Sequence, residues 1–303
     1  MKRFAPGRRP AAPVRLRARR GCLAGLALLL LAGLAHAQPA LWVARRADAT
    51  VYLFGTVHLL PHDTSWRDPS LDRALAASQA LYVEIVDDDP LIMSALVLRY
   101  GIDTAHPLST RLTPAEWDRL QHAARLASID DGRRLNLMKP WLAALTLTVA
   151  PLTKAGLDPA AGVDRQLREA MSRAGKPVRA LETAEQQIRF LADLPMSLQL
   201  GLLRSMLRET DRAGEELGKL IDAWKTGDVA AIARLENDTL AREEPALYRR
   251  LLVERNAAWA QRIQSLLAQP GTYFIAVGAA HLAGPDSLQA RLAALGVTVT
   301  RAP

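Results

Sequence analysis

Two stretches near opposite ends of the chain share one pattern, and this repeat constrains the fold more than any other feature. Residues 51–59 and 273–282 each run through β-branched, aromatic and small apolar side chains to a glycine, two further residues, a histidine and a leucine. Such runs predict buried strands, and the glycine lets the backbone turn sharply where each strand ends. His58 and His281 are therefore expected at the carboxyl ends of two strands, where open α/β sheets form their ligand crevice.

The first 37 residues have the composition of a secretory signal peptide. A basic opening is followed by an apolar run at residues 23–34 and by a small-x-small cleavage site at residues 35–37. The apolar run is shorter than the roughly 20 residues that a membrane-spanning helix needs. We expect cleavage before Gln38 and export across the inner membrane to the periplasm. The single cysteine, Cys22, lies in this leader, so we expect no disulfide and no thiolate chemistry in the mature protein.

Removal of the leader changes the electrostatic interpretation. The whole chain has 39 Lys and Arg against 31 Asp and Glu, a formal net charge of +8. Eight basic residues and no acidic residue leave with the leader, which makes the mature charge formally zero. A basic chain would suggest a nucleic-acid or anionic-membrane partner. For the neutral mature protein we expect no nucleic-acid partner and no membrane span.

Predicted strands cluster at the two ends of the chain, and helical patterns fill the middle. The strands are expected at residues 41–44, 50–54, 80–86, 177–181, 271–277 and 297–300. Helical patterns are expected at residues 69–79, 91–175, 191–269 and 285–295, with breaks at prolines and glycines. The simplest fold joins the two histidine-bearing strands in one sheet, with the helical middle as a cover. We therefore predict a mixed α/β (α+β) fold and one domain over residues 38–303.

Three residues are the first candidates for metal binding or catalysis. Imidazole is a common metal ligand, and two imidazoles with a carboxylate form a frequent catalytic metal set, which suggests His58 and His281 as ligands. Glu84 stands within an apolar run, where burial is costly unless the carboxylate is paired. It is expected as a metal ligand or general base beside His58. The alternative for His58 and His281 is a structural role in which both are hydrogen-bonded. The alternative for Glu84 is a position on an edge strand, where its side chain would face water.

Further candidates lie at a predicted strand end and on predicted helices. Glu182 ends a predicted strand directly before a capped helix, and it is expected either in the site or as a solvated residue. Arg255 could bind a substrate carboxylate or an oxyanion, or it could belong to an ordinary salt-bridged helix face with Trp259. Asp164 is expected as a helix N-cap rather than a catalytic acid.

The context of the other histidines and the absence of common motifs narrow the choice of metal ligands and of functional classes. Pro61 disfavours a helical ligand pair between His58 and His62, and His106 and His122 have polar surroundings typical of the surface. The sequence lacks His-Glu-x-x-His, Gly-x-Ser-x-Gly, a phosphate loop and a dinucleotide fingerprint. The common hydrolase and nucleotide-enzyme classes are therefore disfavoured.

Together these residues resemble the GumN branch of the TraB/GumN family, which is related to the Tiki metalloproteases. The resemblance covers nearly all of the mature chain. The matching pieces occur in order: residues 55–58, 83–84, 139–141, 162–165, 181–183, 255–256 with 259, and 271–282. One local departure is Ala280, where the family usually has glycine.

The resemblance implies a central sheet and, as in the Tiki branch, a metal-dependent peptidase. Carried over by position, the essential residues would be His58, His281 and Glu84, with manganese or cobalt as the metal. In this hypothesis Glu182 or Glu84 takes a proton from water and Arg255 stabilises the oxyanion, with a peptide or protein as substrate. The alternative is a non-catalytic protein of the same fold that captures a peptide or haem, with the same histidines as ligands.

Overall fold

A computed structural model describes residue 1 and residues 38–86, 89–129 and 132–302. The predicted signal peptide, residues 1–37, lies outside the described residues apart from Met1. Across the described residues, no helix combines the length and the apolar character that crossing a bilayer requires.

One six-stranded sheet is the centre of the fold, in the order β4-β3-β5-β2-β1-β6. Its strands are β1 (Leu41–Arg46), β2 (Ala49–Thr56), β3 (Ala80–Val83), β4 (Val178–Ala180), β5 (Gly271–Gly278) and β6 (Val299–Arg301). Strands β1 and β2 form an antiparallel hairpin, and β6 pairs antiparallel to β1 at the edge. The pairs β2–β5, β5–β3 and β3–β4 are all parallel. The two histidine-bearing strands are therefore neighbours, and Thr56 lies opposite Gly278 where both strands end.

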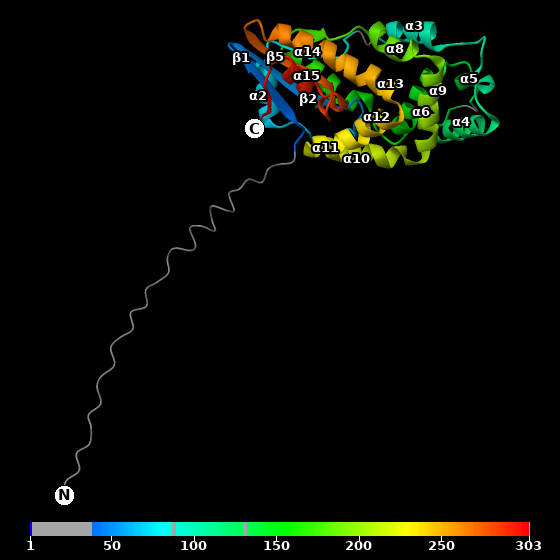
Figure 1. Cartoon of the computed structure of the whole chain (residues 1–303), viewed down its shortest axis with the longest axis horizontal. Helices are drawn as coiled ribbons and strands as arrows, with labels where there is room; N and C mark the ends of the chain where they lie inside the picture. Colours follow the sequence, from blue (N-terminus) through cyan, green and yellow to red (C-terminus); the bar gives the residue numbers. More distant parts are fainter. Residues whose placement is uncertain (2–37, 87–88, 130–131, 303) are drawn as a thin grey trace. The chain divides into compact units, whose positions relative to one another are not determined.

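The predicted helical cover is present, and helices in fact cover both faces of the sheet. One face packs against helices α2 (Pro69–Ala77), α7 (Val163–Arg173), α10 (Ala213–Thr226) and α11 (Val229–Ile232). The other face packs against helices α14 (Glu254–Leu266) and α15 (Leu288–Ala294), which lie over the strands in Figure 1. Side chains alternate between the two faces along each strand, so Phe54 enters the first core and Leu53 the second.

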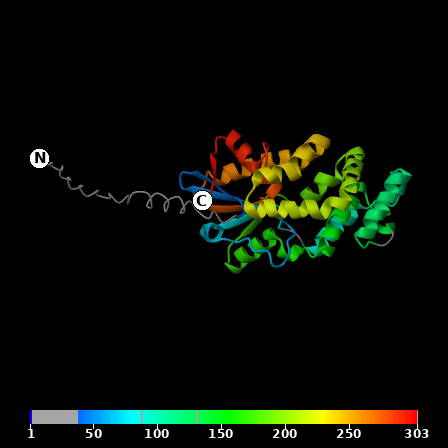
Figure 2. The same cartoon turned by 90° about the horizontal axis from the view of Figure 1, so that it is seen from below.

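The remaining helices form two further cores. They are α3 (Pro90–Gly101), α4 (Pro114–Leu126), α5 (Arg133–Asn136), α6 (Pro140–Lys154), α8 (Ala184–Ala192) and α9 (Met196–Glu209). Both views place α3, α4 and α9 at the end away from the strands (Figures 1 and 2). The short helices α12 (Thr239–Glu243) and α13 (Pro245–Tyr248) precede α14, separated from their neighbours by π-helical turns at Ala233–Asp238 and Arg249–Val253.

Local sequence patterns explain several helix and strand boundaries, but other boundaries differ from the prediction. The capping boxes of Thr113 and Thr183 are both formed. Asp164 is not the expected N-cap: Gly162 caps α7, and Asp164 lies in its first turn. Strand β3 ends at Val83, three residues earlier than predicted. It ends there because the Gly278 N–H of β5 binds the Glu84 side chain rather than its backbone.

Candidate functional site

Four of the predicted residues meet at the carboxyl ends of adjacent parallel strands. Glu84 directly follows β3, and Glu182 follows β4 by two residues. His281 lies on the 3₁₀ turn Ala279–Leu282 after β5, and Arg255 reaches the same place from α14. Since β3 lies between β4 and β5, their ends form one crevice, as expected for parallel strands.

Arg255 joins the two carboxylates in a buried ion-pair cluster. Its Nη2 lies 2.6 Å from Glu84 Oε2 and 2.5 Å from Glu182 Oε1, and its Nε donates to Glu182 Oε2 at 3.2 Å. The three side chains are 6–11% exposed. Gln187 donates to both carboxylates, at 3.1 and 3.2 Å. The expectation that Glu84 could face water on an edge strand is therefore wrong.

A π-helical turn helps to hold the guanidinium. Arg255 Nη1 donates to the carbonyl of Leu251, which lies in the π-helical turn just before α14. In that turn the carbonyls do not follow the regular α-helical pattern, and such turns are frequent at functional sites. Arg255 thus belongs to the crevice, rather than to an ordinary exposed helix face.

The two carboxylates have opposite pKa shifts. Burial by itself would raise the pKa of Glu84, but the charges of His281, Arg255 and His58 and the Gly278 N–H lower it to about 2. Burial raises the pKa of Glu182 against the opposing effect of Arg255. Pairs of titratable groups driven apart in this way often divide acid and base roles. Glu84 is suited to remain ionised, and Glu182 is better suited to exchange a proton.

His281 is a neutral imidazole with a defined tautomer. Its Nδ1 lies 2.7 Å from Asn256 Oδ1, which can only accept, so Nδ1 carries the proton. Nε2 then has a lone pair and accepts from Arg255 Nη1 at 3.1 Å. Burial lowers the pKa of His281 to about 3, and the ring packs 4.5 Å from that of Trp259.

Two asparagines position the turn that carries His281. Asn256 Nδ2 donates to the carbonyls of His281 and Asp286. Asn237 Nδ2, from the first π-helical turn, donates to the carbonyls of Ala280 and Ala283. Sequence reasoning gave no role to Asn237 or Gln187. Neither residue stands in a recognisable motif, and their partners are distant in the chain.

His58 follows β2 by two residues and lines a pocket with Glu84. Its Nδ1 binds Asp164 Oδ1 at 3.0 Å, and this hydrogen bond raises the pKa of His58 to about 9. The side chain is 63% exposed and lines a pocket of about 250 Å³ together with Glu84 and Asp164. Helix α7 begins against this turn, where a Cβ on Gly162 would lie 2.5 Å from the His58 carbonyl.

The candidate ligands match a divalent ion in residue type and in the hydrogen bonding of their histidines, but not in their spacing. In both histidines, Nδ1 forms a hydrogen bond with a side-chain oxygen atom. Metal-binding imidazoles are often oriented by such a bond, which leaves Nε2 to bind the metal. His281 Nε2 lies 4.0 Å from Glu84 Oε1. Within the part of the chain that the structure describes, however, no three His, Asp or Glu side chains are gathered closely enough to hold an ion. Arg255 contacts both Glu84 and His281, so these contacts would have to change when an ion binds.

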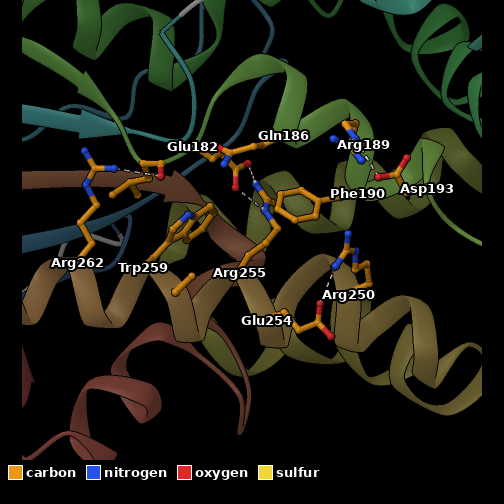
Figure 3. A pocket seen from close by; sticks show the side chains of 12 residues that line it. Glu182, Gln186, Arg189, Phe190, Asp193, Arg250, Glu254, Arg255, Trp259 and Arg262 are labelled. Carbon is orange, nitrogen blue, oxygen red and sulfur yellow. Dashed lines mark hydrogen bonds and ion pairs between the residues drawn. The ribbon is translucent and has the colours of Figure 1, made fainter. Parts of the chain in front are cut away.

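A larger pocket of about 600 Å³ adjoins the same cluster between α8 and α14 (Figure 3). It shares Glu182 and Arg255 with the crevice, and Phe190 lies against the Arg255 guanidinium. The ion pairs Arg189–Asp193 and Arg250–Glu254 lie toward one end of this pocket in Figure 3. The buried cluster is thus reached from two pockets.

The other histidines that the structure describes lie outside the crevice. His62 is 70% exposed and pairs with Asp158. His106 and His122 are 67% and 53% exposed, which confirms their prediction as surface residues.

Comparison with known sequences gives one family. The sequence model of the TraB/PrgY/gumN family matches residues 40–301, from the start of β1 to the end of β6. The uncharacterized protein YbaP of Escherichia coli (strain K12) is 28% identical over 262 residues, covering 85% of this chain and 93% of the relative. An uncharacterized protein of Treponema pallidum (strain Nichols) is 27% identical over 278 residues, covering 84% of this chain and 80% of the relative. Since the family match spans the whole sheet and the crevice at its carboxyl edge, the chain belongs to the TraB/PrgY/gumN family.

Proposed function

We propose that this protein is a metal-dependent hydrolase that cleaves peptide bonds. The observation that carries the proposal is the buried group of Glu84, Glu182 and His281 around Arg255, in which one carboxylate has a lowered pKa and the other a raised pKa. An arrangement of this kind, open to a pocket of about 600 Å³, is suited to acid–base chemistry on a bound substrate.

His58, Glu84 and His281 would hold the metal, with manganese or cobalt as the expected ion. When bound, such an ion polarises a carbonyl group and lowers the pKa of a water. Glu84 is ionised at neutral pH, and His281 is neutral with its Nε2 lone pair available once Arg255 shifts. Both are in the protonation state that metal binding needs.

Glu182 is the proposed general base, because its raised pKa lies closer to neutral pH than that of Glu84. It would take the proton of the attacking water and return it to the leaving amine. Arg255, which contacts both carboxylates, would stabilise negative charge on the carbonyl oxygen during the reaction.

The proposed substrate is a peptide or a protein segment in the periplasm, where the predicted signal peptide would deliver the enzyme. The 600 Å³ pocket offers Phe190 and Trp259 as apolar contacts and charged side chains at its rim. It is large enough for peptide side chains next to the cleaved bond.

The test is a peptide library incubated with the purified protein, first stripped of metal and then loaded with manganese or cobalt. We expect metal-dependent cleavage that is lost in His281→Ala and reduced about 100-fold or more in Glu182→Gln. The matched control is His122→Ala, which changes an exposed histidine and should leave cleavage unchanged.

Cleavage that persists unchanged in His281→Ala would overturn the proposal. An absence of cleavage with every metal, together with a haem Soret band that disappears in His281→Ala, would favour the non-catalytic alternative.

A further inference from the structure

The arginines that line the 600 Å³ pocket between α8 and α14 differ in their partners. They are Arg189, Arg250, Arg255 and Arg262. Arg189 and Arg250 each pair with an acidic residue one helical turn away. Arg255 pairs with both carboxylates of the buried cluster. Arg262 forms no ion pair with any residue that the structure describes, so its charge is available to a ligand.

Uncharged groups hold Arg262 at the end of the pocket. Its Nη1 donates to the carbonyl of Leu181 at 3.4 Å, and its guanidinium lies 5.8 Å from the centre of the Tyr82 ring. In the described part of the chain, Nε and Nη2 find no acceptor. The residue is exposed and lines the pocket, so a ligand in the pocket can reach this side chain.

A second arginine, Arg179, lies beside Tyr82. Arg179 of β4 pairs in register with Tyr82 of β3. Paired residues on neighbouring strands point to the same face of a sheet, and Tyr82 belongs to the face that α14 covers. Arg179 is exposed, and it too forms no ion pair within the described ranges. Two cations that no described carboxylate neutralises thus lie near Tyr82, which favours an anionic ligand group.

The spacing of the arginines on α14 relates this end of the pocket to the buried cluster. Arg255 and Arg262 both line the pocket, and Trp259 lies between them in Figure 3. They are seven residues apart, so they are separated by roughly 10 Å along the helix axis, at about 1.5 Å per residue. An extended peptide advances about 3.4 Å per residue, so about three residues would span this distance.

We propose that Arg262, with Arg179 beside it, binds a carboxylate of the ligand in this pocket. A guanidinium matches a carboxylate in shape and charge, because two parallel N–H groups donate to its two oxygens. That the ligand is a peptide cleaved beside Arg255 rests on the proposed function. The carboxylate would then lie about three residues beyond the cleaved bond. Its source is either the peptide's own C-terminus or an acidic side chain.

The test measures binding, by fluorescence anisotropy, of dansyl-tetraalanine with a free C-terminal carboxylate and of the same peptide with a C-terminal amide. We expect the acid to bind about five- to tenfold more tightly than the amide. The preference should be lost in Arg262→Gln and partly kept in Arg262→Lys. The control Arg73→Gln changes an exposed arginine on α2, which packs against the opposite face of the sheet, and should keep the full preference.

Equal binding of acid and amide by the wild type, or an undiminished preference in Arg262→Gln, would overturn the proposal. A third peptide, the tetraalanine amide with its last alanine replaced by glutamate, identifies the source of the carboxylate. If it binds as tightly as the acid, Arg262 accepts acidic side chains; if only the acid binds tightly, Arg262 recognises the chain end. Either result supports a carboxylate site.

This inference and the proposed function fail in different ways. Binding is measured without cleavage, so a carboxylate preference in a protein that cleaves no peptide would count against the hydrolase alone. Metal-dependent cleavage by a protein that binds acid and amide equally would overturn the carboxylate site alone.

Discussion

Arg255 donates a hydrogen bond from Nη1 to Nε2 of His281 at 3.1 Å, although a guanidinium and an imidazole would both carry positive charge if both were protonated. The contact is favourable because Asn256 holds the imidazole proton on Nδ1 and leaves a lone pair on Nε2. The same guanidinium neutralises part of the charge of Glu84 and Glu182. Protonation of His281, ionisation of the carboxylates and the position of Arg255 are therefore linked.

Replacement of Arg255 should be strongly destabilising. Arg255→Met leaves Glu84 and Glu182 buried without their cation, and we expect a loss of about 3–5 kcal/mol in the free energy of unfolding. Urea denaturation measures the change. The control Arg165→Met removes an exposed pair with Glu169 and should change stability by less than about 1 kcal/mol. Equal effects of the two substitutions would show that the buried cluster has no special energetic role.

Acid should destabilise the protein through His281 and Glu84. Both groups have lower pKa values in the folded protein than their ordinary values of 6.5 and 4.5, at about 3 and about 2. The unfolded chain therefore binds more protons, and stability falls as the pH drops from 6.5 toward 2. For His281 the loss is on the order of 5 kcal/mol. Urea denaturation at a series of pH values should show a flatter profile in His281→Gln, and an unchanged profile would contradict the assignment.

The pair of His58 and Asp164 should give the opposite pH dependence. Its hydrogen bond raises the pKa of His58 to about 9, so the stabilisation is present below pH 6.5 and is lost as the pH rises through 9. An NMR titration of the His58 ring should report this pKa directly. In Asp164→Asn the pKa should fall toward the ordinary value of 6.5. A His58 ring that titrates near 6.5 in the wild type would contradict the pairing.

Asn237 should act on the site through the turn that carries His281. Asn237→Ala leaves the carbonyls of Ala280 and Ala283 without this donor and should cost about 1–3 kcal/mol of stability. Because the turn is no longer held in place, cleavage by the proposed enzyme should fall through kcat more than through KM. A variant with wild-type stability and wild-type kcat would show that Asn237 does not position the turn.

Local patterns in the sequence were enough for the framework of the site. The repeated strand–Gly–x–x–His unit predicted that His58 and His281 follow two strands of one sheet, and β2 and β5 are indeed parallel neighbours. The sequence pattern also indicates the capping boxes of Thr113 and Thr183, because a capping box involves only residues three positions apart. Glu84 stood out because a carboxylate within an apolar run must find a partner.

The interaction partners of these site residues could not be predicted from the sequence in the same way. The alternative of an ordinary surface role for Arg255 stayed open, and the role of Asp164 was predicted wrongly. The sequence contains many carboxylates and arginines at helical spacing, and most of them form exposed pairs such as that of Arg165 and Glu169. Only burial distinguishes the pair of Arg255 and Glu84, and burial depends on how α14 packs on the sheet.

By itself, the sequence determined the alternation of apolar and polar residues, the glycines near the ends of the two histidine-bearing strands, and so a sheet with His58 and His281 at its carboxyl edge. The tertiary structure alone decided that Arg255 lies between Glu84 and Glu182, that Asp164 holds His58, and which groups are ionised. The reason is physical. Arg255 and Glu84 are 171 positions apart, and the energy of two buried charges depends on their distance and on the water excluded around them, which are settled only when the helices pack.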